Sequence, residues 1–156
     1  MRLTFTKRDG KTDDLTIMRS DGSSERIAAP KQGILPHDMI HYVVECALPV
    51  PGFLSMIAAG HPIAFAAMES QPAVEAVERL VETMQAEMWS GRASAADLVT
   101  LYEQTCAARG HKPIPVTEAD IATIRTGIDA ITAQWTALRT NASLTLDFAP
   151  RPLAAG

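Results

Sequence analysis

Three short segments at the start of the chain alternate polar and apolar residues, and Asp-Gly pairs separate them. The segments are residues 2–6 (RLTFT), 14–18 (DLTIM) and 24–28 (SERIA), and the pairs are Asp9-Gly10 and Asp21-Gly22. Alternation with a period of two buries one face of a strand, and Asp-Gly favours tight hairpin turns because both residues tolerate positive φ. The sequence therefore predicts a three-stranded antiparallel meander.

Beyond the meander, apolar residues recur every three or four positions, which is the spacing of amphipathic helices. A first helix is predicted over residues 36–48, because Pro36 suits a first helical turn and Pro49 ends the helix. Longer helices are predicted over 72–90, 94–109 and 117–139, and residues 143–148 alternate again as an added edge strand. We expect an α+β fold in which the meander packs on four to five helices. Residues 1–149 would form one domain and residues 150–156 a flexible tail.

The apolar stripes of the long helices have two interpretations. The longest stripe consists of Ile121, Ile124, Ile128, Ile131, Trp135 and Leu138, spaced by three and four residues. Such stripes either fill the core of their own domain or pack against a second copy, so a homodimer is an alternative. Trp89 and Trp135 both lie on stripes and are expected in the core.

Residues 47–68 contain no Asp, Glu, Lys or Arg and are long enough to cross a bilayer. Pro49, Pro51, Gly60 and Pro62 would break the helix that such a span requires. The segment is therefore predicted to form short helical pieces that are buried or present an apolar surface to a partner.

The sequence argues against nucleic-acid binding and against secretion. The net charge is −4, and basic residues form no dense cluster, so nucleic-acid binding is disfavoured. The N-terminus lacks the basic-then-apolar order of a secretion signal. We expect a cytoplasmic protein with no membrane partner.

Chemically reactive side chains are concentrated in residues 35–45 (LPHDMIHYVVE). On a helix, His37 and His41 lie one turn apart and about 40° apart around the axis, so both imidazoles can bind one metal ion. The expected ion is zinc or another divalent transition metal.

The string HDxxH resembles the HExxH signature of zincin metallopeptidases, with Asp38 in place of the glutamate. The resemblance implies that His37 and His41 are metal ligands and that Asp38 activates water. Aspartate is one methylene shorter than glutamate, and a general base must reach its proton. A different hydrolysis, or binding without turnover, is therefore favoured over proteolysis.

The third metal ligand is left open by the sequence. Glu45 continues the row of His37 and His41, but eight residues of helix rise about 12 Å. Glu45 is therefore either a ligand, a proton acceptor, an outer hydrogen-bond partner of His41 or a structural residue. His61 and Glu69 are other candidates for the third ligand, and His111 is a weaker one.

A wider resemblance covers residues 20–62. The Asp21-Gly22-Ser23 turn and the LPHDxxHxxxE block, followed by Gly52-Phe53 and Ala59-Gly60, are similar to a family of uncharacterised bacterial proteins. That family brings no assigned reaction, so the resemblance supports the block as a unit and names no activity.

Three functional hypotheses follow. The leading one is a divalent-metal-binding protein that, if it is an enzyme, is a hydrolase with Asp38 or Glu45 as proton acceptor. The second is a non-catalytic homo-oligomeric or protein-interaction domain with a structural His/Glu cluster. The third is a metal-free pocket for a small molecule of unknown identity, in which His37, His41 and Glu45 act as acid–base groups.

Overall fold

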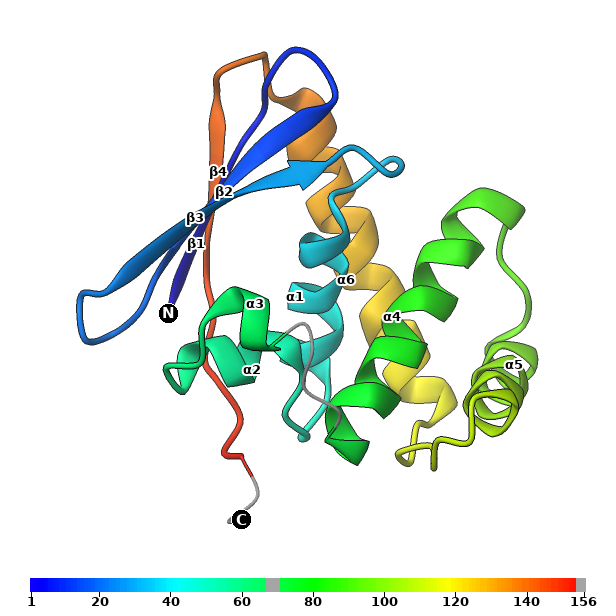
Figure 1. The fold of residues 1–156 in the computed structure, drawn as a ribbon. Helices are drawn as coiled ribbons and strands as arrows, with labels where there is room; N and C mark the ends of the chain where they lie inside the picture. Colours follow the sequence, from blue (N-terminus) through cyan, green and yellow to red (C-terminus); the bar gives the residue numbers. More distant parts are fainter. Residues whose placement is uncertain (67–70, 154–156) are drawn as a thin grey trace.

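The computed structural model describes residues 1–66 and 71–153, which form a sheet covered by helices (Figure 1). Within these residues the strands are β1 (Arg2–Thr6), β2 (Thr12–Met18), β3 (Ser24–Pro30) and β4 (Ser143–Asp147). The helices are α1 (His37–Ala47), α2 (Phe53–Ala58), α3 (Ile63–Ala66), α4 (Pro72–Ser90), α5 (Ala95–Ala108) and α6 (Glu118–Ala137). The predicted α+β fold is confirmed.

The sheet is antiparallel, with strand order β3-β2-β1-β4. The two hairpin turns contain the Asp-Gly pairs, as predicted. Gly10 and Gly22 have φ of 92° and 85°, whereas Asp9 and Asp21 do not have positive φ. Strand β4 pairs with β1, and Phe5 lies opposite both Leu15 and Leu144. The C-terminal edge strand is thus confirmed, and it extends the sheet on the side of β1.

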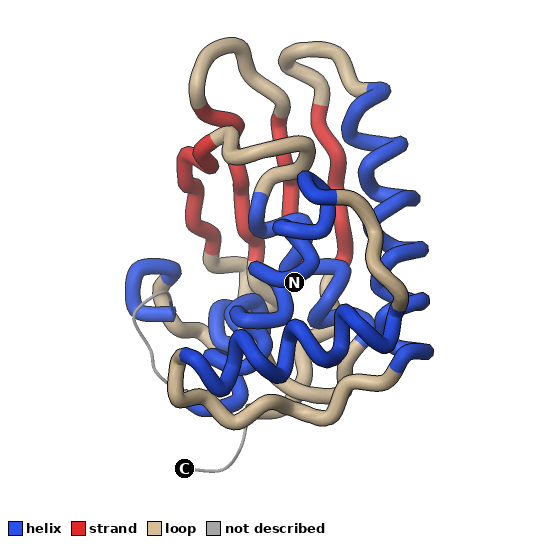
Figure 2. The backbone as a smooth tube through the Cα atoms, turned by 90° about the vertical axis from the view of Figure 1, so that its right-hand side faces the viewer, coloured by secondary structure: helices blue, strands red, loops and turns tan. Residues whose placement is uncertain are grey.

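One face of the sheet carries the apolar residues and receives the helices. The side chains of Leu3, Phe5, Leu15 and Ile17 are completely buried. Figure 2 looks from the helical side and shows the strands behind the helices. Each of these side chains contributes about 1.5–3 kcal/mol by leaving water, so the face is strongly held against the helical layer.

Helix α1 is the central helix of this layer, in contact with α4, α6 and α2. Met39, Ile40, Val43 and Val44 are buried, as expected for the apolar face of the helix. His41 is also buried, so α1 carries polar side chains into the interior. This position makes α1 the element that can hold a chemical site inside the fold.

The stripe of α6 is buried in the chain's own core from Ile121 to Trp135, which favours the first of its two interpretations. The prediction that Trp89 lies in the core is wrong. The exposed fraction of Trp89 is 66%, whereas that of Trp135 is 4%. Trp89 is close to the end of α4, and a Cβ at Gly33 would lie 3.0 Å from its ring. Its ring therefore rests on the loop that precedes α1, with its other face in solvent.

Residues 53–58 and 63–66 form the short helices expected in the uncharged segment. Leu54, Met56 and Ile57 are completely buried, so α2 packs into the core of the chain. Among the residues described, no helix combines the length and the apolar character needed to cross a membrane. After β4, the backbone N–H of Arg151 donates to Ser55 Oγ at 3.2 Å, and this contact joins the end of the chain to α2.

Candidate metal centre

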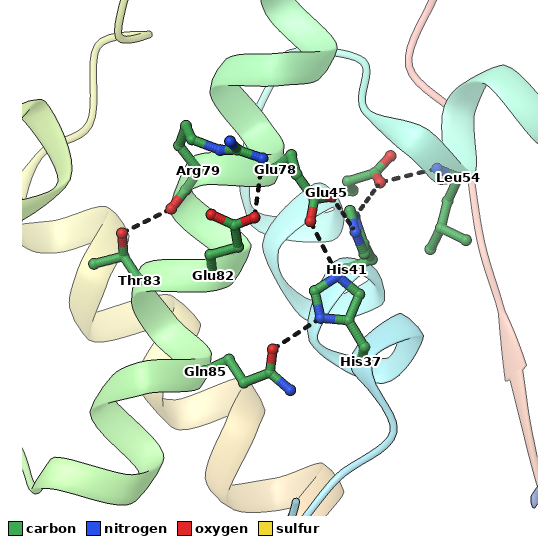
Figure 3. A network of polar contacts seen from close by, with 9 residues as sticks. All are labelled: His37, His41, Glu45, Leu54, Glu78, Arg79, Glu82, Thr83 and Gln85. Atoms are coloured by element: carbon green, nitrogen blue, oxygen red, sulfur yellow. Dashed lines mark hydrogen bonds and ion pairs between the residues drawn. The ribbon is translucent and has the colours of Figure 1, made fainter. Parts of the chain in front are cut away.

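His37 and His41 lie at the start of α1, one turn apart, as the spacing predicts. Helix α1 begins at His37 directly after Pro36, whose fixed φ of −53° leads the chain into the first turn. The two imidazole rings pack edge to face, with their centroids 4.9 Å apart and their planes at 78°. Both rings turn toward α4, which packs against α1 (Figure 3).

Glu78 of α4 lies between the two imidazoles. Its Oε1 is 3.2 Å from His37 Nε2, and its Oε2 is 2.8 Å from His41 Nε2. One ligand atom from each of the three residues lies within 4.8 Å of the others, so the group could hold a metal ion. Neighbouring ligand atoms around tetrahedral zinc are about 3.3 Å apart at normal bond lengths, so binding would require only small side-chain movements.

The other nitrogen of each imidazole has its own partner. His37 Nδ1 donates to Oε1 of Gln85 at 2.9 Å, and His41 Nδ1 donates to Oε1 of Glu45 at 3.2 Å (Figure 3). A hydrogen bond from Nδ1 orients the ring and leaves the Nε2 lone pair for a metal ion. Both histidines are therefore arranged as metal-ligating histidines usually are.

Glu45 is fully buried, and it also caps the next helix. Its Oε1 accepts a hydrogen bond from the backbone N–H of Leu54 at 2.9 Å, and its Oε2 accepts one from that of Ser55 at 3.1 Å. These are early N–H groups of α2, whose own N-cap residue, Gly52, has no side chain to accept them. A Cβ at Gly52 would lie 2.6 Å from Glu45 Cδ, so this contact requires glycine.

Electrostatics favours a charged cluster in the metal-free protein. Burial opposes protonation of His41, but its hydrogen bonds to Glu45 and Glu78 outweigh burial and raise its pKa to about 10. Burial lowers the pKa of His37, but the contact with Glu78 raises it overall. Burial acts to raise the pKa of Glu78, but hydrogen bonds from both histidines hold it well below its usual range. A metal ion would therefore replace protons at this site.

The remaining residues singled out in the sequence lie in different places. Asp38 is half-buried on α1, and burial raises the pKa of its carboxyl against the opposing charges of His41 and His37. His61 lies between α2 and α3, and His111 Nε2 is 3.2 Å from Glu75 Oε2. Neither His61 nor His111 belongs to the ligand group found among the described residues. Glu69 lies outside the described residues.

Two residues of the site, Glu78 and Gln85, were missed by the sequence analysis. Both are on α4, 41 and 48 positions after His37. The sequence signal that could have found them is their position on the helix. Glu78 directly follows the buried Val77, and Gln85 is seven residues after Glu78, so both lie on the same side of α4. Polar residues at such spacing beside an apolar stripe indicate a polar seam, but they do not identify its partner.

The described geometry defines a cluster of two histidines and one carboxylate at the contact of α1 and α4, which could hold a metal ion. Comparisons with protein-family models, with curated proteins and with solved structures found no significant match to the chain. What the cluster does must therefore be inferred from its own chemistry.

Proposed function

We propose that this chain is a divalent-metal-binding protein whose ligands are His37, His41 and Glu78. The observation that carries the proposal is the convergence of both Nε2 atoms on Glu78, while each Nδ1 atom donates to a different residue, Gln85 or Glu45. In the metal-free protein the same orientation lets both imidazoles pair with Glu78. The donor set suits zinc, and it also suits other first-row transition metals.

We further propose that the site is of the open type, in which the metal serves hydrolysis. Three protein ligands leave coordination positions for water and substrate, as in catalytic zinc sites. The side chains of His37 and Glu78 are 29% and 30% exposed, whereas that of His41 is 2% exposed. The open positions would therefore face solvent on the side of His37 and Glu78, where a substrate can approach.

The chemistry of such a site is the activation of water and the polarisation of a substrate oxygen. The protein orients the ligands through Gln85 and Glu45, which fix the two rings by their Nδ1 atoms. We assign Glu45 this orienting role because both of its oxygens already accept backbone hydrogen bonds in the interior. The proposal therefore needs no metal bond from Glu45.

The test is elemental analysis of protein purified without a metal-chelating tag, before and after reconstitution with zinc. We expect close to one metal ion per chain, lost in the double variant His37→Ala/His41→Ala and strongly reduced in Glu78→Ala. His111→Ala is the matched control, because it removes a histidine that pairs with Glu75 outside the cluster. Equal metal content in the wild type and the double variant, or none in either, would contradict the proposal.

One observation favours a second candidate function, a homo-oligomeric or interaction domain. Ile34 and Trp89 are large apolar side chains that remain exposed, and the Trp89 ring lies against Gly33, the residue before Ile34. A homodimer through this surface should dissociate in Trp89→Lys without a change in metal content. Light scattering over a range of concentrations measures this, and a monomeric wild type at high concentration would contradict it.

A further inference from the structure

Glu82 lies on α4 one turn after Glu78, and it is outside the three-residue ligand group. Successive helical residues turn by about 100°, so Glu82 lies about 40° to one side of Glu78 and Val81 about 60° to the other. Gln85, the second α4 partner of His37, is about 20° from Glu78. His37 contacts Glu78 and Gln85, whose positions on α4 lie between those of Glu82 and Val81 around the helix.

The flank that carries Glu82 is the solvent side of the cluster. Val81 is completely buried, whereas the side chain of Glu82 is 37% exposed. Helical side chains incline toward the N-terminus of their helix, so the side chain of Glu82 inclines toward Glu78, one turn earlier. Glu82 is therefore on the exposed flank of α4, one turn from Glu78, on the side where the proposed open coordination positions would lie.

The partner of Glu82 holds one of its two carboxylate oxygens. Arg79 Nη2 donates to Glu82 Oε1 at 2.9 Å, three residues away on the same helix (Figure 3). The side chain of Arg79 is buried, and its buried Nε has no hydrogen-bond partner among the described residues. Because breaking this pair would leave an uncompensated buried charge, Glu82 stays with Arg79. The other oxygen, Oε2, is then the one that can accept a further hydrogen bond.

We propose that Glu82 accepts a hydrogen bond, and then a proton, from water bound to the metal at His37, His41 and Glu78. In this step one O–H bond of the water breaks and the proton moves to a carboxylate oxygen of Glu82. The electron pair stays on the water oxygen, which becomes hydroxide and remains a ligand. The inference rests on the proposed function, and it replaces Asp38 and Glu45 as the proton acceptor.

The other two carboxylates are less suited to this step. Glu45 lies on the Nδ1 side of His41, fully buried, with both oxygens accepting backbone hydrogen bonds. Asp38 lies about 60° from His41 and about 20° from Glu45 around α1, on the same helix as the two histidines. Its carboxyl is largely enclosed, and burial raises its pKa against the charges of His41 and His37. Glu82 alone among the three extends from the opposite helix beside Glu78, on the exposed side.

Cobalt(II) is the probe that tests this step without a substrate. Its visible absorption reports both binding and the ionisation of bound water during a pH titration. We expect Glu82→Gln to bind cobalt within about threefold of the wild type and to lower the pKa of the bound water by about one to two units, because a nearby anion is removed. Glu75→Gln is the control, since it removes the same charge from α4 at a carboxylate held by His111.

Each other outcome overturns the inference. An unchanged water pKa in Glu82→Gln shows that Glu82 does not contact the water, and an equal shift in Glu75→Gln shows a general field effect. A loss of cobalt affinity of tenfold or more shows that Glu82 is a direct ligand. The proposed function fails separately, and the inference with it, if the wild type binds no cobalt or if His37→Ala/His41→Ala binds cobalt equally well.

Discussion

Replacing Glu45 by glutamine should destabilise the metal-free protein strongly, although the two side chains have nearly the same shape. Oε1 accepts from Leu54 N–H and His41 Nδ1, and Oε2 accepts from Ser55 N–H and Ser55 Oγ. An amide offers one acceptor oxygen and places an NH2 group where the other oxygen was. In the better orientation the NH2 faces Ser55, whose hydroxyl can turn to accept, and one buried backbone N–H is left without a partner.

The magnitude follows from these contacts. An orphaned buried N–H costs about 1–3 kcal/mol, and the bonds that remain lose the strength of a charged acceptor. We expect Glu45→Gln to lower the free energy of unfolding by about 2–4 kcal/mol, a large part of the about 5–15 kcal/mol typical of a domain. The same change should weaken metal binding by about 10–100-fold, because His41 loses its orienting carboxylate.

Urea unfolding in the presence of a chelator measures this effect, with the fluorescence of buried Trp135 as the signal. Trp89→Phe is the background of choice, because Trp89 is exposed and would mask the change. Glu103→Gln, at an exposed position of α5, is the matched control and should change stability by less than about 0.5 kcal/mol. A loss of this small size in Glu45→Gln would refute the role of Glu45 as the cap of α2.

Three further predictions concern the same contacts. Gly52→Ala places a Cβ 2.6 Å from Glu45 Cδ and should cost about 1–3 kcal/mol in the same urea titration; an unchanged midpoint would contradict the close approach. Burial disfavours protonated His41, but its carboxylate partners raise its pKa from 6.5 to about 10, so its stabilisation of the metal-free protein is fully present below pH 6.5 and lost as the pH rises to about 10. Thermal unfolding with chelator present should show this fall, and a melting temperature that rises over the same range would exclude it. Gln85→Leu leaves His37 Nδ1 without its acceptor and should weaken zinc binding about 10–100-fold by calorimetry, whereas equal affinity would show that Gln85 does not orient the ring.

The fold could be predicted closely because its signals are local. Residues 2–6 and 72–90 form β1 and α4 with the bounds that alternation and helical spacing predict. Strands β2 and β3 are longer than predicted, because Thr12 pairs with Pro30 at the far end of their hairpin. That extension comes from pairing between strands, which alternation within one strand does not show.

The candidate site could be predicted only in the part that one helix supplies. His37 and His41 are neighbours because of helical geometry alone, so their approach is visible in the sequence. Glu78 joins them through the packing of α4 against α1, which depends on the apolar faces of both helices. Glu45 is a candidate third ligand from the sequence because it is on the same helix as the two histidines. In the structure Glu45 contacts the opposite nitrogen of His41 from Glu78.

The two histidines differ in how firmly they are held, and this difference bears on how a metal would reach the site. His41 is buried between Glu45 and Glu78, and Glu45 is itself fixed by the backbone of α2. His37 is partly exposed, and it is held by the partly exposed Glu78 and by Gln85, a neutral amide. An ion would therefore arrive from the side of His37 and Glu78, where side chains can move into solvent. His41 would provide the preformed ligand at the inner end of the site, so variants at Gln85 should change the exchange rate of the metal more than the fold, while variants at Glu45 should change both.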